Sequence, residues 1–184
     1  MCSVGFLTVV HDFVQQLVWL CRSNIPSEIQ SLKRLKTLDA SNNRFDVIPD
    51  GIFALIGLET LCFSQNLLFE WPKNLKLLSA LTYLDLSGNN LQNYISDEYG
   101  SDHGDMLPDD ALCCLTQLTH LDLCDCGIMA LPSLSCLICL DTLLVHKNHL
   151  ITVPALPTSV RKVDVAFNLL ATVFFCMNLS LLCS

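Results

Sequence analysis

Apolar side chains recur at the same relative positions six times along this 184-residue chain. Each copy has apolar residues at its first, fourth and sixth positions, an Asn at its ninth in five copies, and an apolar residue at its eleventh. In the third copy these residues are Leu81, Leu84, Leu86, Asn89 and Leu91, within LTYLDLSGNNL. The copies begin at 35, 58, 81, 118, 140 and 160. Self-similarity at a period of about 20–50 residues indicates stacked, like units.

The short spacing within each copy predicts a β-strand. Leu38 and Ala40, or Leu84 and Leu86, are two residues apart and therefore point to one face of a strand. One such strand cannot bury its apolar face alone, so we expect the copies to stack into a parallel sheet over a shared core. The Asn follows at the turn, where its amide can satisfy unpaired backbone groups. Cys126 replaces it in the fourth copy, and a thiol is a poorer hydrogen-bonding group.

The second half of four copies begins with an apolar-Pro pair. These pairs are Ile48-Pro49, Trp71-Pro72, Leu131-Pro132 and Val153-Pro154. Proline fixes φ and suits the first turn of a helix. Segments 51–58 and 73–81 then carry apolar residues at three- and four-residue spacing, which predicts short helices or single turns on the outer side.

The pattern LxxLxLxxNxL, followed by xxIP, resembles the leucine-rich-repeat family over about 25–173. Its 23-residue form is similar to that of intracellular scaffolds of the Scribble, Erbin and Ras-scaffold kind. The resemblance implies an α/β fold: a leucine-rich-repeat solenoid with a curved parallel sheet on the concave face and short helices or turns on the convex face. It implies no cofactor and no catalytic residue.

The two ends depart from the repeat. Ile25-Pro26 fits the outer half of an earlier copy, but Asp12 and Gln15 stand where that copy needs apolar strand residues. We therefore divide the chain into a divergent N-terminal cap or non-native start at 1–24, an array of about six repeats at 25–173, and an apolar tail at 174–184. Neither end is polar, as a solenoid cap should be, so we expect a fragment.

The 37-residue step between the third and fourth copies contains an acidic insertion at 96–110. Six of the 18 acidic residues lie there, with no Lys or Arg. This segment is interpreted as a solvated insertion; the alternative is a docking loop for a basic partner. Its acidic residues do not keep the spacing of a calcium loop.

Charge and cysteine content restrict the partners and the compartment. The net charge of −8 argues against nucleic acid and against an anionic membrane. The 11 cysteines form no compact secreted-scaffold pattern, so we interpret them mainly as buried thiols of a cytoplasmic protein. The apolar stretch near each end is too short or too poorly flanked to predict a signal peptide or a membrane span.

Opposite the core, the strands predict three columns of outward side chains, one residue per copy. The first column is Thr37, Thr60, Tyr83, His120, Thr142 and Lys162. The second is Asp39, Cys62, Asp85, Asp122, Leu144 and Asp164. The third is Ser41, Ser64, Ser87, Cys124, His146 and Ala166. We predict that a partner binds Lys36, Thr37, Asp39, Tyr83, Asp85, His120, Asp122, His146 and Lys162.

The sequence favours two catalytic arrangements and one metal site less than partner binding. Asp85 and Asp122 would be neighbours, but an open face does not raise the pKa of a carboxylic acid as glycoside hydrolysis requires. Ser87 and His120 differ by four positions, roughly 13 Å along a strand, so no triad forms. The four cysteines at 124, 126, 136 and 139 fall on three sides of a solenoid and cannot meet at one zinc ion.

The predicted function is therefore protein binding by a signalling scaffold or adaptor, with a small GTPase or phosphatase as the partner class. Tyr83 is the expected hot spot, and the aspartates would attract a basic surface. Two alternatives remain open: the recognition fragment of a larger enzyme such as a ubiquitin ligase, cyclase or kinase, and a fragment of a receptor ectodomain.

Overall fold

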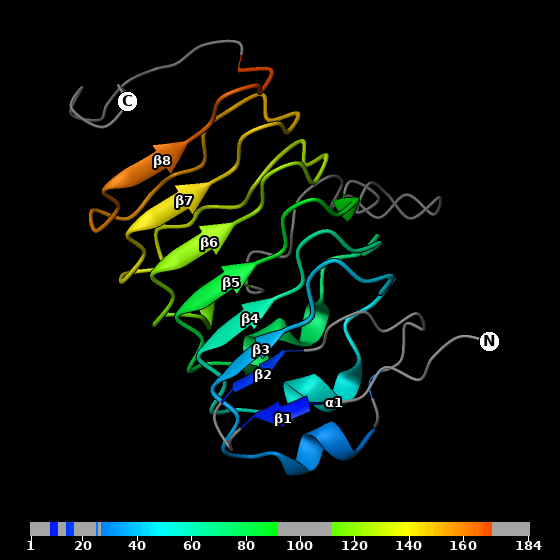
Figure 1. Ribbon diagram of the computed structural model, residues 1–184. Coiled ribbons are helices and arrows are strands. Elements are labelled where there is room, and N and C mark those ends of the chain that lie inside the picture. The colour runs from blue at the N-terminus through cyan, green and yellow to red at the C-terminus, as the bar shows by residue number, and fades with distance from the viewer. Residues whose placement is uncertain (1–7, 11–13, 17–24, 26, 92–111, 171–184) are drawn as a thin grey trace, which may run out of the picture.

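The computed structural model describes residues 8–10, 14–16, 25, 27–91 and 112–170. Its strands form one eight-stranded sheet in which each strand pairs with the next along the chain (Figure 1). The strands are β1 (Thr8–Val10), β2 (Val14–Gln16), β3 (Thr37–Asp39), β4 (Thr60–Cys62), β5 (Tyr83–Asp85), β6 (His120–Asp122), β7 (Thr142–Leu144) and β8 (Lys162–Asp164).

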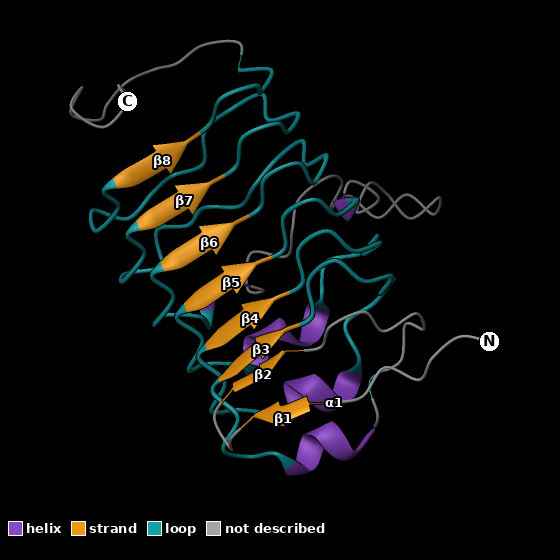
Figure 2. Cartoon of the chain, viewed as in Figure 1, coloured by secondary structure: helices purple, strands orange, loops and turns teal. Residues whose placement is uncertain are grey.

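From β2 to β8 the strands are parallel, and their register follows the sequence repeat. Leu38 pairs with Leu61, and the same position then continues through Leu84, Leu121, Leu143 and Val163. The 37-residue step between β5 and β6 leaves this register unbroken. Figure 2 shows the strands on one side of the solenoid and loops and short helices on the other. The predicted solenoid with a parallel sheet is confirmed.

The core is filled by the residues that the repeat places inward. The central strand leucines from Leu38 to Leu143 are fully buried, as are Ala40, Phe63 and Val145 two residues further along their strands. Phe45 and Phe63 pack in adjacent turns of the solenoid with ring centroids 5.4 Å apart. Burial of one large apolar side chain contributes about 1.5–3 kcal/mol, so these inward residues stabilise the array.

Inward-pointing asparagines join neighbouring turns of the solenoid. The Nδ2 of Asn66 donates to the carbonyl oxygens of Phe63 and, in the preceding turn, Ala40, each at 3.0 Å. Its Oδ1 accepts the N–H of Phe45 at 3.1 Å. Asn89 and Asn148 repeat the arrangement and are equally buried. The predicted role of the asparagines is confirmed.

Each strand from β3 to β8 is followed by a residue in the left-handed region, so these turns of the solenoid bend at the same place. These residues are Asn42, Gln65, Gly88, Asp125, Lys147 and Phe167, with φ between 54° and 65°. Asn, Asp and Gly adopt this conformation readily, whereas a bulky side chain does so rarely. Phe167 is therefore the outlier of the series.

On the outer side, the helices whose bounds lie within the described residues are η1 (Ser27–Ser31), α1 (Asp50–Phe53) and η2 (Lys73–Leu77). Pro49 and Pro72 precede α1 and η2, as the apolar-Pro pairs predict. Among the described residues after 130, the outer segments are turns and extended chain instead. Within the described part of the chain, no helix has the length and apolar character needed to span a membrane.

At the N-terminal end, β1 and β2 form an antiparallel pair, and β2 continues the parallel ladder onto β3. Gln15 takes the register position of Leu38, one repeat before it. The rest of 1–24, the acidic insertion at 96–110 and the tail at 174–184 lie outside the described residues.

Candidate functional site

The outward face of strands β3 to β8, called here the strand face, carries the side chains predicted to bind a partner. Strand pairing places the first two predicted columns in register, residue against residue. The third column is held together by contacts such as the 2.9 Å hydrogen bond from the Ser64 hydroxyl to that of Ser41. Most of these side chains are half-buried, because neighbouring strands flank each of them.

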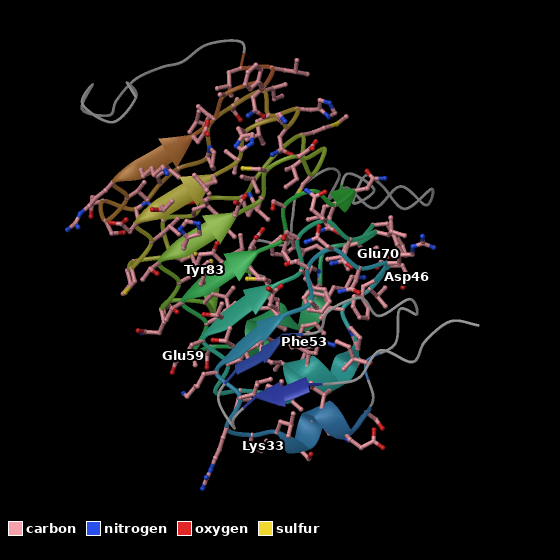
Figure 3. The ribbon with its side chains drawn as sticks, in the orientation of Figure 1. Lys33, Asp46, Phe53, Glu59, Glu70 and Tyr83 are labelled. Carbon is pink, nitrogen blue, oxygen red and sulfur yellow. The ribbon has the colours of Figure 1, made fainter. Side chains whose placement is uncertain are left out.

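An aromatic pair occupies the middle of the strand face. Tyr83 on β5 and His120 on β6 are directly paired, and their rings stack with centroids 4.5 Å apart and an interplanar angle of 8°. Figure 3 shows Tyr83 on the sheet side of the molecule. Burial, and then the charge of Asp85, raise the pKa of the Tyr83 hydroxyl. Stacking holds a flat, rigid surface in place before any partner arrives.

The aspartates of the second column have a structural role that the sequence did not reveal. In Asp39, Asp85, Asp122 and Asp164, Oδ1 accepts the backbone N–H two residues further along. Asp85 Oδ1 also accepts the Ser87 hydroxyl at 2.7 Å. These bonds fix each carboxylate at the end of its strand, and Asp85 and Asp122 are register neighbours. They form a preorganised negative surface beside the aromatic pair.

Cys62 stands between Asp39 and Asp85 in this column. Burial, followed by the charges of Asp85 and Asp39, raises the pKa of its thiol to about 12. The thiol is therefore protonated at neutral pH and is not a nucleophile. It is a small, uncharged element of the face.

The two lysines predicted to bind the partner lie at the two ends of the strand face, and Thr37 lies beside the first of them. Lys36 precedes β3, and its Nζ lies 2.7 Å from Glu59 Oε1 and 3.2 Å from the Gly57 carbonyl oxygen. Thr37 is half-buried beside Thr60 on β4. Lys162 is exposed on β8, at the opposite end of the sheet. Glu59 was not among the predicted residues, and its pairing across one repeat with Lys36 is the signal that would have indicated it.

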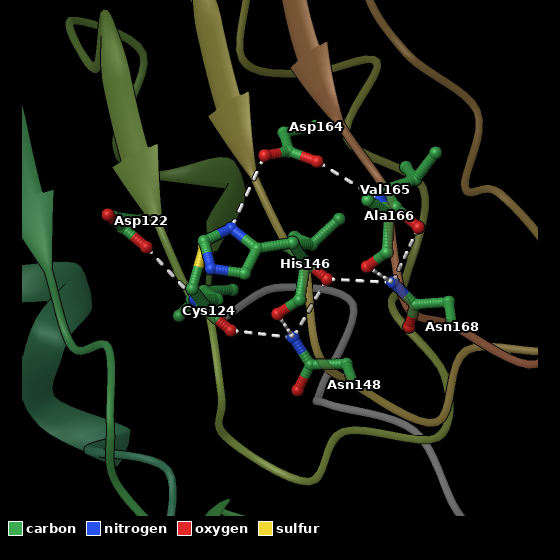
Figure 4. A network of polar contacts seen from close by, with 10 residues as sticks. Asp122, Cys124, His146, Asn148, Asp164, Val165, Ala166 and Asn168 are labelled. Atoms are coloured by element: carbon green, nitrogen blue, oxygen red, sulfur yellow. Dashed lines mark hydrogen bonds and ion pairs between the residues drawn. The ribbon is translucent and has the colours of Figure 1, made fainter.

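A second polar cluster lies at the ends of β6 to β8 (Figure 4). Nδ1 of His146 lies 2.9 Å from Cys124 Sγ and 3.3 Å from Asp164 Oδ2. Burial, and then the hydrogen bond to Asp122, raise the pKa of the Cys124 thiol. Both contacts use the same ring nitrogen, and the thiol stays protonated, so the cluster orients His146 rather than activating Cys124.

The structure does not assemble the other constellations. The Ser87 hydroxyl donates to Asp85 Oδ1, whereas His120 stacks on Tyr83, four residues before Ser87 in the sequence. Cys126 is buried and its Sγ donates to the Leu86 carbonyl oxygen at 3.2 Å, while Cys136 and Cys139 are half-buried further along the chain. Within the described ranges, no group of three or more His, Cys, Asp or Glu side chains could hold a metal ion.

Residues 33–91 match the family model described as leucine rich repeat. The described turns beyond 91 keep the same register, and the last two of them keep the asparagine, as Asn148 and Asn168. The described array is a leucine-rich-repeat solenoid. Its structure resembles a leucine-rich-repeat protein of Leptospira interrogans, with a TM-score of 0.66, 24% identity, and coverage of 79% of this chain and 35% of the other.

The solenoid also resembles the leucine-rich-repeat domain of APL1B, with a TM-score of 0.67, 22% identity, and coverage of 81% of this chain and 40% of that one. At such identities the likeness shows the fold alone. Among curated proteins, the adenylate cyclase of Schizosaccharomyces pombe is 40% identical over 72 residues, which are 39% of this chain and 4% of the cyclase. The leucine-rich-repeat fold is one that supports protein interaction, and none of these matches reveals a catalytic site in this chain.

Proposed function

We propose that this solenoid is a protein-interaction module, a scaffold or adaptor that binds a basic surface of its partner on the strand face. The observation that supports this most directly is the stacked pair of Tyr83 and His120 beside the register neighbours Asp85 and Asp122. Rigid aromatic side chains contribute strongly to binding, and fixed carboxylates attract a basic partner and orient it.

The sequence resemblance suggests a signalling protein, such as a small GTPase or phosphatase, as the partner. We place the module in the cytoplasm. The free thiols of Cys62, Cys124, Cys126, Cys136 and Cys139 support a reducing compartment.

The test is capture of a partner from cell lysate by the immobilised chain, with proximity labelling as an independent readout. Tyr83→Ala and the charge reversals Asp85→Lys and Asp122→Lys should weaken capture about tenfold or more, because each removes a central contact. Because Asp85 and Asp122 also accept backbone hydrogen bonds, circular dichroism must show that each variant folds.

The matched control for the charge reversals lies away from the strand face. Glu70→Lys is a charge reversal at an exposed residue on the other edge of the solenoid (Figure 3), and it should leave capture unchanged. If folded Tyr83→Ala, Asp85→Lys and Asp122→Lys proteins all bind as the wild type does, the strand face is not the binding surface.

A second candidate is that the array is the recognition segment of a larger enzyme. The match to an adenylate cyclase, of whose length this chain spans 4%, favours it. A full-length transcript with a catalytic domain in the same reading frame would establish this candidate. Disulfide mapping would separate both from a receptor ectodomain, since paired cysteines would indicate secretion.

A further inference from the structure

The outer edge of β8 has the geometry of a self-pairing strand. In the parallel ladder, Lys162 N–H bonds the Asp141 carbonyl oxygen and the Asp164 carbonyl oxygen accepts the Val145 N–H. Residues that bond to one neighbouring strand alternate with residues that face the other. The N–H and C=O of Val163 therefore point away from β7, and β8 is the last strand of the described sheet.

The side chains around Val163 are complementary to a second copy of themselves. If two β8 strands pair antiparallel about Val163, its N–H and C=O exchange two hydrogen bonds with the Val163 of the other copy. Lys162 then lies opposite Asp164, and this pair occurs twice because of the twofold symmetry. Such non-hydrogen-bonded positions bring side chains closest, with Cα atoms about 4.5 Å apart.

Neither charge prevents this pairing. Lys162 is exposed, and within the described part of the chain it makes no ion pair. Asp164 contacts His146 through Oδ2 at 3.3 Å and the Ala166 N–H through Oδ1, and its side chain remains 41% exposed. A carboxylate accepts several hydrogen bonds, so a lysine from the other copy can join these contacts.

The end of the core beside β8 is also apolar and incompletely covered by the described residues. Val163 and Val165 are half-buried, whereas Leu143 and Val145 at the same positions one repeat earlier are fully buried. Phe167 is 79% exposed and Leu169 is 62% exposed. Phe167 also adopts a φ of 57°, which is unusual for a bulky residue.

We propose that the occupant of this edge is a second copy of the chain, which pairs β8 with β8 and forms a twofold-symmetric dimer with one continuous sheet. The twofold axis is perpendicular to the sheet, so both strand faces point the same way and the two open core ends meet. The dimer would present two strand faces side by side, which allows bivalent binding.

The test uses sedimentation velocity of the full chain over a wide concentration range. In a dimer of Lys162→Asp, the new aspartate of each copy lies opposite Asp164 of the other copy. In a dimer of Asp164→Lys, the new lysine of each copy lies opposite Lys162 of the other copy. Each variant should raise the dimer dissociation constant about tenfold or more. Lys73→Asp, which makes the same charge change on η2, should not alter it. Circular dichroism should show that all three variants fold.

The decisive step is to mix the two weakened variants. In a heterodimer of Lys162→Asp with Asp164→Lys, both cross-strand pairs regain opposite charges, so dimers should reappear. A wild-type chain that stays monomeric at every concentration would overturn the proposal, because residues 171–184 or solvent would then cover the edge. A dimer that neither variant weakens, or that mixing does not restore, would place the interface elsewhere.

Discussion

At the residue scale, the inward asparagines do more than fill space. Asn89 donates Nδ2–H to the carbonyl oxygens of Phe63 and Leu86, and its Oδ1 accepts the Leu68 N–H. One buried amide thus satisfies backbone groups in two successive turns of the solenoid. An unsatisfied buried polar group costs about 1–3 kcal/mol, so the position is highly constrained.

Asn89→Ala should lower the free energy of unfolding by about 3 kcal/mol, because Leu68 N–H and two carbonyl oxygens lose their partner in a dry environment. Urea unfolding followed by circular dichroism measures this. The control Asn74→Ala, at an exposed site with a 3.4 Å contact to Asp50, should change the free energy by less than about 0.5 kcal/mol. Equal effects of the two changes would contradict the bridging role.

The fourth copy shows how the chain accommodates Cys126 at an asparagine position. Its Sγ reaches the Leu86 carbonyl oxygen, the acceptor that an amide nitrogen would use. It has no oxygen for the Leu91 N–H, which bonds the backbone carbonyl of Cys126 instead. The backbone therefore supplies what the thiol lacks. Burial raises the pKa of this thiol to about 12, so it remains neutral.

At the element scale, the bend after each strand depends on one residue with positive φ. Gly88, at φ 65°, is the glycine of the series. A Cβ built there would collide with Gln65 Nε2, so the Gln65 side chain packs over the bend of the next turn. The amide end of Gln65 can move, but the backbone conformation cannot.

Gly88→Ala should lower the free energy of unfolding by about 1–2 kcal/mol through left-handed strain. Gly88→Asn should cost less, because Asn tolerates this region and Asn42 already occupies it in the first repeat. Urea titration of both variants gives the comparison. Adding Gln65→Ala to Gly88→Ala removes the contact but leaves the strain. Full recovery in that double variant would show that crowding, not φ, is limiting.

At the scale of the whole molecule, each turn of the solenoid contacts its neighbours, so burial depends on position in the stack. Val145 and Val165 occupy the same place in successive repeats. The first is fully buried, and the second is half-buried next to the last described strand.

Val145→Ala should therefore lower the free energy of unfolding by about 2 kcal/mol, and Val165→Ala by roughly 1 kcal/mol or less. Unfolding must be measured at a concentration where the chain is monomeric. A larger loss at Val165 under those conditions would mean that the last turn is buried by more than the described residues.

Sequence periodicity was enough to predict the solenoid, because strand position, core leucines, inward asparagines and outer helices all depend on contacts that repeat with the chain. The predicted register was confirmed even across the 37-residue step. The candidate site was predictable only as columns of side chains. Their role in binding a partner stays a prediction.

Contacts between repeats had to come from the tertiary structure. The stacking of His120 on Tyr83 joins residues 37 positions apart, and the contact of His146 with Cys124 joins a thiol to an imidazole one repeat away. Periodicity predicts which residues face the same way. Side-chain torsions and neighbouring charges determine which of those side chains are in contact. Which strand lies at the edge of the described sheet depends likewise on how the turns are stacked.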